Sequence, residues 1–429
     1  MTFAQCRAYL EKLQVLGVKL GLDNVRVLLA ALENPERAYP SVLVAGTNGK
    51  GSVCAMLDAV LGRHGLRSGL YTSPHLTDVR ERIRLGGRMI SRPDFCRALA
   101  SVREASERLL GSGKMSAPPT HFEALTCAAL LHFRERRADI ALLEVGLGGR
   151  FDAVNAVTPV LSVITSIGLD HERYLGKTLA RIAFEKAGII KSGVPVVCGA
   201  SPGTARTVIR RTARERGADF VGVFDRPRSL RAHKKKSRFE FVYDAGDKTY
   251  RFRPRLAGRH QGANGAVALM AARTLGRTWR LLEERRILEG IAAAEWPGRL
   301  EIVRRSPPVI LDGAHNPDGA AALRDYVRDF IRRPLVLVFA AMRDKDIAGI
   351  SRILFPLARR IVLTKFSFHR AAEPEDILRL ARRRDSRIIL ENDPGLALRL
   401  ALREARRLRG AVLVTGSLFL VGEIKRRFV

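Results

Sequence analysis

The chain has 429 residues, 46% of them hydrophobic, which predicts a folded protein of two or more domains and excludes a disordered chain. Its net charge of +32 favours anionic partners. The arginines are spread along the chain, and the one dense basic run is His233-Lys234-Lys235-Lys236. We therefore expect anionic small-molecule substrates and consider nucleic acid the less favoured partner.

The cysteines and the apolar runs indicate the compartment. There are five cysteines, an odd number without a Cys-x-x-Cys pair, which argues against a disulfide framework or a zinc site. The first residues lack the basic-then-apolar order of a signal peptide, and no apolar run is long enough to span a membrane. We expect a cytoplasmic protein without a membrane partner.

The first two thirds of the chain alternate between expected helices and strands. Helices are expected at 3–16, about 25–32, 54–61, 93–110, about 120–136, about 178–187 and about 204–216, and after Asn264. Strands are expected at 42–45, from 68 to a break at Pro74, and at 139–145, 160–167 and 194–198, with hairpins at 83–90 and 220–254. This order predicts an α/β fold with a doubly wound, mainly parallel sheet, which binds ligands at the carboxyl ends of its strands.

The last third repeats the alternation on a smaller scale. A boundary is expected at Trp296-Pro297-Gly298-Arg299, which divides the chain into domains 1–296 and 297–429. Beyond it, strands at 309–312, 335–340, 360–364, 387–390 and 411–415 alternate with helices at about 317–332, 347–357, 374–384, 395–408 and 418–427. The pattern predicts a second, smaller Rossmann-like α/β domain, which has no phosphate loop of its own.

A phosphate loop is expected at Gly46-Thr47-Asn48-Gly49-Lys50-Gly51-Ser52, between an apolar strand and a helix. Backbone N–H groups and the helix dipole favour an anion there, Lys50 adds a mobile cation, and Ser52 adds a hydroxyl for a phosphate-bound metal. The spacing is not that of a Walker motif, which has four residues before Gly-Lys and places Ser or Thr directly after the lysine. A plain glycine-rich turn is the alternative, and the flanking strand and helix disfavour it.

Three more polar side chains follow strand ends at the same edge of the expected sheet. They are Ser73, Glu144 and His171. Hydroxyl and carboxylate oxygens suit Mg²⁺, and an imidazole is tolerated beside them. A structural, hydrogen-bonded histidine remains open for His171. Lys186, on a helix beside Glu185, would ordinarily be a salt-bridged surface lysine.

These stretches together resemble one family. The matching motifs are Gly46 to Ser52, Thr72-Ser73-Pro74-His75-Leu76, Leu143 to Arg150, Ser166 to His171, Glu185 to Ile190 and Leu311-Asp312-Gly313-Ala314-His315-Asn316-Pro317. In this order, and over nearly the whole chain, they resemble the folylpolyglutamate synthase/dihydrofolate synthase family of the Mur ligase superfamily. The short spacing of the phosphate loop is similar to that of the family.

The resemblance implies roles for individual residues. Asn48, Gly49, Lys50, Gly51, Ser52, Asn264, Arg299 and Asp312 would bind ATP, and Ser73, Glu144 and His171 would bind Mg²⁺. Lys50, Lys186, His171 and Arg299 would be catalytic, with Lys186 carbamylated by carbon dioxide and His315 assisting. Lys19, Leu20, Gly21, Leu22, Thr120, His121, Phe122, Glu123 and Phe151 would hold the pterin substrate.

The implied reaction is the ATP-dependent ligation of L-glutamate to dihydropteroate, to the γ-carboxylate of tetrahydrofolate-(poly)glutamate, or to both, through an acyl phosphate. The family tends to be monomeric. Two departures, Phe151-Asp152-Ala153-Val154-Asn155 and Asn24, lie near the expected pterin pocket and weaken the assignment of substrate. Another Mur-type acid–amino-acid ligase and a basic, nucleic-acid-binding P-loop ATPase are the alternatives.

Overall fold

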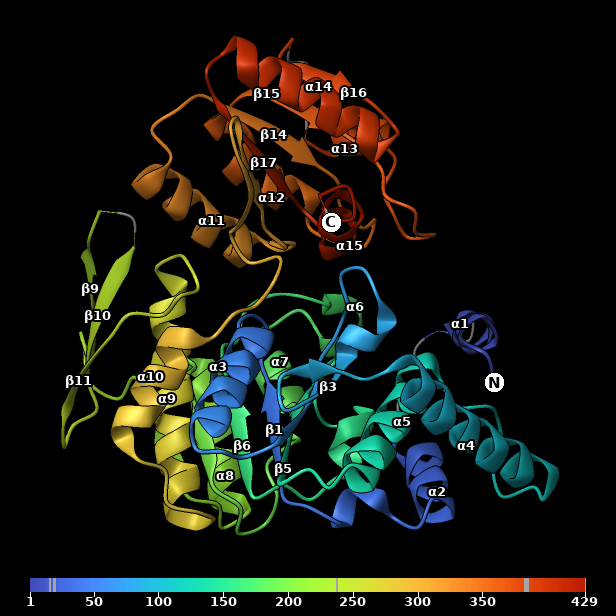
Figure 1. The fold of residues 1–429 in the computed structure, drawn as a ribbon. Helices are drawn as coiled ribbons and strands as arrows, with labels where there is room; N and C mark the ends of the chain where they lie inside the picture. The colour runs from blue at the N-terminus through green and yellow to red at the C-terminus, as the bar shows by residue number, and fades with distance from the viewer. Residues whose placement is uncertain (15–16, 18–20, 237, 382–385, 429) are drawn as a thin grey trace.

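The chain folds into two α/β domains, which lie one above the other in Figure 1. The computed structural model describes residues 1–14, 17, 21–236, 238–381 and 386–428. The expected fold class is confirmed: a doubly wound, mainly parallel sheet carries the phosphate loop, and a smaller α/β domain follows it. None of the helices in these ranges is both long enough and apolar enough to cross a membrane.

The large sheet of the first domain has the strand order β4-β3-β2-β5-β1-β6-β7-β8. Its parallel strands are β2 (Ser68–Tyr71), β5 (Ile140–Glu144), β1 (Ser41–Ala45), β6 (Leu161–Ile164), β7 (Val196–Cys198) and β8 (Phe220–Gly222). The antiparallel strands β3 (Ile83–Leu85) and β4 (Arg88–Met89) extend one edge. The central strands β1 and β5 are buried along their whole length, so they are apolar runs without alternation.

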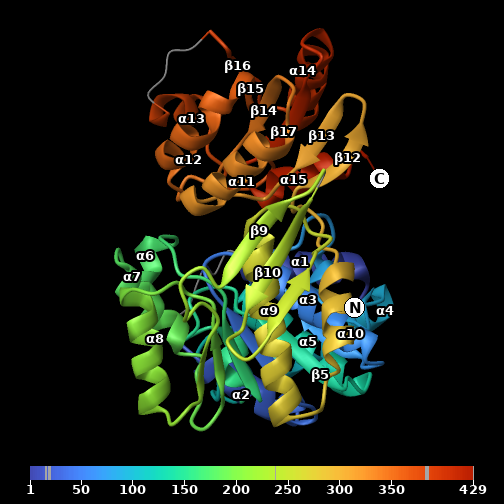
Figure 2. The same cartoon turned by 90° about the vertical axis from the view of Figure 1, so that its left-hand side faces the viewer.

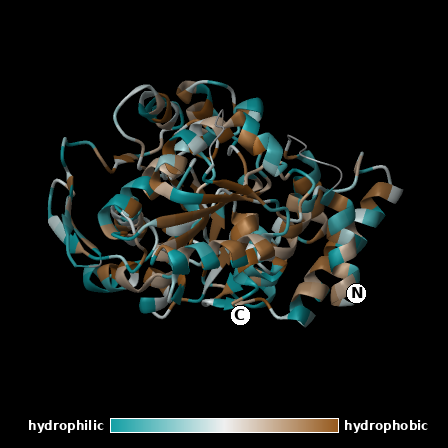
Figure 3. Cartoon of the chain, turned by 90° about the horizontal axis from the view of Figure 1, so that it is seen from above, coloured by the Kyte–Doolittle hydropathy of each residue, from teal (hydrophilic) through white to brown (hydrophobic). Residues whose placement is uncertain are grey.

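Helices cover both faces of this sheet. They are α1 (Phe3–Gln14), α2 (Asp23–Ala31), α3 (Lys50–Arg63), α4 (Arg92–Gly111), α5 (His121–Glu135), α6 (Glu172–Leu175), α7 (Leu179–Ala187), α8 (Thr204–Glu215), α9 (His260–Thr278) and α10 (Glu284–Ala293). Short 3-10 helices lie at η1 (Pro35–Arg37), η2 (Val79–Arg82) and η3 (Ala153–Ala156). One apolar core joins the sheet to α3, α9 and α10, and the other joins it to α1, α2, α4, α5, α7 and α8. In Figure 3 the hydrophobic strands accordingly lie inside helices whose outer faces are hydrophilic.

The segment 220–254 differs from the expected pair of hairpins. Its first strand, β8, joins the large sheet in parallel with β7. The rest forms a separate antiparallel sheet of β9 (Leu230–Lys234), β10 (Phe239–Asp244) and β11 (Thr249–Phe252). A strand as short as β8 has no periodicity that distinguishes a parallel edge strand from one strand of a hairpin, and this is why the prediction for β8 was wrong.

The β9–β10 hairpin extends toward the second domain in Figure 2 and contacts it. Lys234 Nζ donates a 2.5 Å hydrogen bond to the carbonyl of Asp329, and Arg259 pairs with the carboxylate of Asp329 at 2.8 Å. The rings of Phe239 and Phe330 pack edge to face, with centroids 5.1 Å apart. Lys234, in the dense basic run, therefore helps to hold the two domains together.

The second domain is built on a sheet of order β12-β13-β17-β14-β15-β16. Its strands are β12 (Glu301–Arg305), β13 (Pro308–Leu311), β14 (Leu335–Phe339), β15 (Ala358–Leu363), β16 (Ile388–Leu390) and β17 (Ala411–Thr415). Its helices are α11 (Pro317–Phe330), α12 (Ile347–Leu354), η4 (Phe355–Leu357), α13 (Pro374–Leu380), α14 (Pro394–Arg407) and α15 (Leu418–Lys425). Strand β12 was not expected, because its polar residues form an antiparallel edge without an apolar run. The division of the chain at 296/297 stays a prediction.

Candidate active site

The phosphate loop follows β1 directly and leads into α3, which begins at Lys50, four residues before the helix expected from apolar spacing. Gly49, the residue before the helix, has a φ of 85°, a left-handed conformation that glycine adopts without strain. Thr47 N–H donates to the Ser166 carbonyl at 2.8 Å and Asn48 N–H to the Ser166 hydroxyl at 3.0 Å, which fastens the loop to the end of β6. The loop is a rigid anion cradle at the helix N-terminus.

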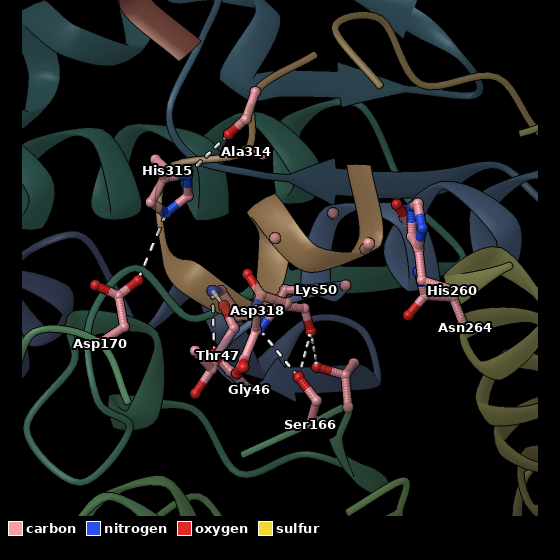
Figure 4. A pocket seen from close by; sticks show the side chains of 18 of the residues that line it. Gly46, Thr47, Lys50, Ser166, Asp170, His260, Asn264, Ala314, His315 and Asp318 are labelled. Carbon is pink, nitrogen blue, oxygen red and sulfur yellow. Dashed lines mark hydrogen bonds and ion pairs between the residues drawn. The ribbon is translucent and has the colours of Figure 1, made fainter. Parts of the chain in front are cut away.

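The loop lines a cavity of about 440 Å³, which we call the nucleotide cavity and which Figure 4 shows from close by. All the residues expected to bind ATP line it: Asn48, Gly49, Lys50, Gly51, Ser52, Asn264, Arg299 and Asp312. So do Ser73, Glu144, His171, Lys186 and His315. Residues that lie far apart in the sequence and on both domains therefore share one space.

Close packing explains why glycines stand at positions 49 and 51 of the loop. A Cβ atom on Gly51 would lie 2.8 Å from the indole nitrogen of Trp296, and a Cβ on Gly49 would lie 3.1 Å from the side-chain carbonyl carbon of Asn264. Asn264 is held by Gln261, which also reaches Ser52 with a weak 3.5 Å contact. The glycines thus let Trp296 and Asn264 lie directly against the phosphate loop.

Lys50 folds back over the loop. Its ammonium donates to the carbonyls of Gly46 at 3.1 Å and Thr47 at 3.3 Å. These long hydrogen bonds hold the ammonium beside the phosphate loop, where phosphate oxygens can replace the two carbonyl oxygens.

Glu144 ends β5 as a buried carboxylate, 4% exposed. One oxygen accepts the N–H of Ser73 at 3.0 Å, which ties two of the expected metal ligands together. Burial raises the pKa of Glu144, and the charges of Lys50, Arg299 and Arg82 oppose that shift. A cation at the carboxylate would remove the cost of burying its charge.

His171 directly precedes α6 and has a left-handed backbone, at a φ of 53°. Its Nε2 lies 3.3 Å from the ammonium of Lys345, and Lys345 pairs with Asp170 at 2.6 Å. Burial, followed by Lys345, lowers the pKa of His171 to about 4, so the imidazole is neutral and can offer a lone pair.

The residues present fit Mg²⁺ better than a softer metal. Within the described ranges, no three His, Cys, Asp or Glu side chains are grouped as a metal-binding set. The expected metal ligands are the side chains of Glu144 and His171 and the hydroxyl of Ser73, and these three could fill only part of the coordination shell of the ion. That suits an ion that keeps several waters and shares its other ligands with phosphates.

Lys186, on α7, is not the surface lysine that its helical position would suggest. It is 5% exposed, and its amine donates to the Gly46 carbonyl at 2.9 Å. Burial, followed by the charge of Lys50, lowers its pKa to about 7. A large part of this lysine is therefore a neutral amine at physiological pH.

The second domain contributes to the same cavity through the connection between the domains. Asp312 accepts N–H groups from Leu300 at 3.0 Å and Ala314 at 2.9 Å, so it also fixes the shape of this connection. Burial raises the pKa of both Glu144 and Asp312, and the charge of Arg299 opposes that shift. In Figure 4, His315 points toward Asp170, with its Nε2 3.6 Å from the carboxylate.

A second cavity of about 470 Å³, which we call the acid cavity, adjoins the first. Most of the expected pterin-binding residues line it: Gly21, Thr120, His121, Phe122, Glu123 and Phe151. Thr120 and Glu123 also cap α5 reciprocally, with bonds of 3.2 and 2.7 Å. Leu22 packs against the apolar core instead, and Lys19 and Leu20 lie outside the described residues.

The two cavities meet where they share lining residues. These are Ser73, Pro74, Gly146, Leu147, His171, His315 and Leu418. Each domain supplies part of this junction, so molecules held in the two cavities can meet there.

Several residues of the site were not expected from the sequence. The carboxylate of Asp170 joins Lys345, His315 and Asn316, all of them on the second domain. Asn316 also exchanges side-chain hydrogen bonds with Asn48, at 3.0 and 3.3 Å. Lys345 follows β14, so the rule that ligands bind at strand carboxyl ends could have drawn attention to it.

Comparisons with known proteins agree with this arrangement. Residues 44–272 match the Mur ligase middle domain, and residues 298–418 match the Mur ligase, glutamate ligase domain. A phosphate-loop domain followed by a glutamate ligase domain, with the site between them, defines the class as Mur-type ligases.

Individual relatives narrow the class. The chain is 34% identical over 429 residues to the dihydrofolate synthase/folylpolyglutamate synthase of Bacillus subtilis, with 99% of each chain covered. Among solved structures, folylpolyglutamate synthase of Mycobacterium tuberculosis complexed with ADP and AMPPCP is 30% identical, with a TM-score of 0.91 and 99% of both chains covered. Escherichia coli FolC in complex with DHPP and ADP is 31% identical, with a TM-score of 0.87 and coverage of 100% of this chain and 97% of that one. The chain belongs to the dihydrofolate synthase/folylpolyglutamate synthase family of Mur ligases, which confirms the resemblance seen in the sequence.

Proposed function

We propose that the protein is an ATP-dependent ligase that joins L-glutamate to dihydropteroate, to the γ-carboxylate of a reduced folate bearing glutamate, or to both. The single observation that carries this is the junction of the nucleotide cavity with the acid cavity. An acid held in one cavity can present its carboxylate there to the terminal phosphate of ATP held in the other. The relatives named above, and the ADP and DHPP bound in the E. coli structure, support the same chemistry.

The reaction needs two steps. A carboxylate oxygen attacks the γ-phosphorus, ADP leaves, and an acyl phosphate forms. The amine of glutamate then attacks the acyl carbon, phosphate leaves, and the amine loses a proton. The protein forms no covalent bond, so its contribution is to position the reactants and to stabilise charge.

The phosphoryl group is stabilised by residues of both domains. Lys50 and the loop N–H groups bind the phosphates from one side, and Arg299 lies across the cavity on the connection to the second domain. Asn264 and Asp312 line the cavity around the nucleotide. Ser73, Glu144 and His171 would hold Mg²⁺, which when bound neutralises charge on the phosphates.

We also propose that Lys186 works as a carbamate. Its neutral amine can add to carbon dioxide with loss of one proton, which gives an anion at a position where an ordinary lysine carries a positive charge. The lowered pKa supports this chemistry because a protonated lysine cannot react. A carbamate at this position would carry negative charge where Lys50 supplies positive charge.

The setting of the enzyme is also a proposal. The described cysteines are free and buried, which supports a reducing compartment such as the cytoplasm. A monomer is the expected state. Small molecules remain the favoured partners, because the dense basic run contacts the second domain in part.

The test is a phosphate-release assay with ATP, Mg²⁺, L-glutamate and either dihydropteroate or tetrahydrofolate as the acid. We expect phosphate release that requires both the acid and glutamate. Turnover with neither acid would refute the folate assignment and favour a Mur-type ligase for a different acid. ATP hydrolysis stimulated by DNA or RNA, independent of glutamate, would favour the nucleic-acid alternative.

A further inference from the structure

Arg82 presents a buried positive charge to the acid cavity. It ends η2, is 8% exposed, and lines this cavity. Its Nε donates to His75 Nδ1 at 3.0 Å, and in the described part of the chain no carboxylate forms an ion pair with it. The adjacent Glu81 carboxylate instead accepts hydrogen bonds from the backbone N–H groups of residues 76–78.

Burial lowers the pKa of the Arg82 guanidinium, and its neighbours Tyr71, Glu144 and Glu81 oppose that shift. Burial, followed by the charge of Arg82, lowers the pKa of His121 to about 3, so this ring is neutral. A guanidinium remains charged in such surroundings, and a buried charge without a counter-ion is costly. The cluster is therefore suited to an anionic ligand.

The position of Arg82 indicates which anion. Its carbonyl accepts the N–H of Thr72 at 3.0 Å, so Arg82 lies beside the strand end that carries Ser73. Ser73, the next residue along from Thr72, lines both cavities. Arg82 thus lies beside the junction of the cavities, where the acid must meet the terminal phosphate.

We propose that the guanidinium of Arg82 binds the reacting carboxylate of the acid substrate and holds it at the junction. This inference rests on the proposed function. A carboxylate and a triphosphate repel each other, and a paired cation on the acid lowers the cost of their approach. The planar guanidinium can bind one carboxylate oxygen while the other faces the γ-phosphorus. The α-carboxylate of glutamate is the other carboxylate that could use this charge, so the test must separate the two.

The test compares two inhibitors that differ in one group. Pteroate carries the carboxylate, and its carboxamide carries a neutral group of the same shape. We expect the wild-type enzyme to prefer the carboxylate by about 10- to 100-fold in Ki, as for a charged hydrogen bond, and Arg82→Gln to reduce this preference to about one. Arg82→Lys should keep part of it. Arg80→Gln is the matched control, because Arg80 lies on the same turn but pairs with Asp78 at 2.7 Å.

The ratio of the Ki values of pteroate and its carboxamide separates a loss of carboxylate binding from a general distortion of the acid cavity. A misshapen cavity would weaken both inhibitors together and leave their ratio unchanged. A wild-type ratio in Arg82→Gln would overturn the proposal, as would a raised KM for glutamate with that ratio intact. If Arg82→Gln does not fold, Arg82→Lys takes its place. A reduced preference of Arg82→Lys for the carboxylate over the carboxamide supports the proposal, and a preference equal to that of the wild type overturns it. Failure of the proposed function is distinct, because the wild-type enzyme would then turn over neither acid.

Discussion

Replacing Lys186 by methionine should abolish activity without destabilising the protein, which is unusual for a buried site. The lysine lies inside the nucleotide cavity, and its amine has one hydrogen bond, to Gly46 at 2.9 Å. Burial lowers its pKa from 10.5 to about 7. Methionine has similar length and brings no charge to bury, so it removes the cost of burial together with the proposed carbamate.

The magnitude follows from proton linkage. Between pH 7 and 10.5 the folded enzyme binds fewer protons at this lysine than the unfolded chain does, so its stability rises with pH across this window. At about 1.4 kcal/mol per pKa unit, the full shift sets an upper limit of about 5 kcal/mol. Subtracting about 1 kcal/mol for the lost hydrogen bond, and allowing for relaxation, we expect Lys186→Met to be more stable by on the order of 2–3 kcal/mol at pH 7. The gain should vanish toward pH 10.5.

Urea unfolding in CO₂-free buffer, at pH values from 7 to 10, measures this difference. Bicarbonate should raise wild-type activity, and acetate or formate should partly restore Lys186→Ala by supplying the missing anion. Lys191→Met is the control, since the pKa of Lys191 is also lowered by burial, to about 8, but its amine bonds to the Asn155 carbonyl at 2.9 Å and it is not part of the cavity lining. A Lys186→Met enzyme that is destabilised equally at every pH, or that stays active, would refute the reasoning.

Three further predictions concern the same site. Glu144→Gln should keep the Ser73 N–H bond but reduce turnover by at least about 100-fold, and a Mg²⁺ titration of phosphate release that matches wild type would contradict the metal assignment. Lys345→Met leaves the buried Asp170 carboxylate without its cation, so small-angle scattering should show a larger radius of gyration; an unchanged profile would argue against a latch between the domains. Gly51→Val should weaken ATP binding because it collides with Trp296, and calorimetry should show partial recovery in Gly51→Val/Trp296→Ala but not in Gly51→Val/Trp279→Ala.

The parts of the site that the sequence predicted well carry local patterns. The phosphate loop lies between an apolar strand and a helix, and Ser73 and Glu144 each follow an apolar run. Parallel strands bring such ends to one edge, so local pattern and topology together were enough to place these residues in one cavity.

The parts that were missed depend on the second domain and on desolvation. Asp170 and Lys345 are 175 residues apart and lie on different domains, so no spacing connects them. Lys186 was expected in the site only from the family resemblance, because its neighbour Glu185 suggested a surface ion pair, and only the folded structure shows that its amine points inward to Gly46. Arg82 was not predicted for the same reason, because the absence of an ion-pair partner for a cation can be recognised only when its neighbours in the fold are known.

The contacts of Asn316 connect domain closure to the reaction centre. Its side chain caps α11 by accepting the Gly319 N–H at 2.8 Å, and it also bonds to Asn48 in the phosphate loop and to Asp170 beside His171. One side chain of the second domain therefore contacts both the phosphate loop and the residue next to an expected metal ligand. The junction of the two cavities is also incomplete without His315 and Leu418 from the second domain. The second domain thus completes the junction, and an acyl phosphate formed there would be enclosed by residues of both domains and shielded from water.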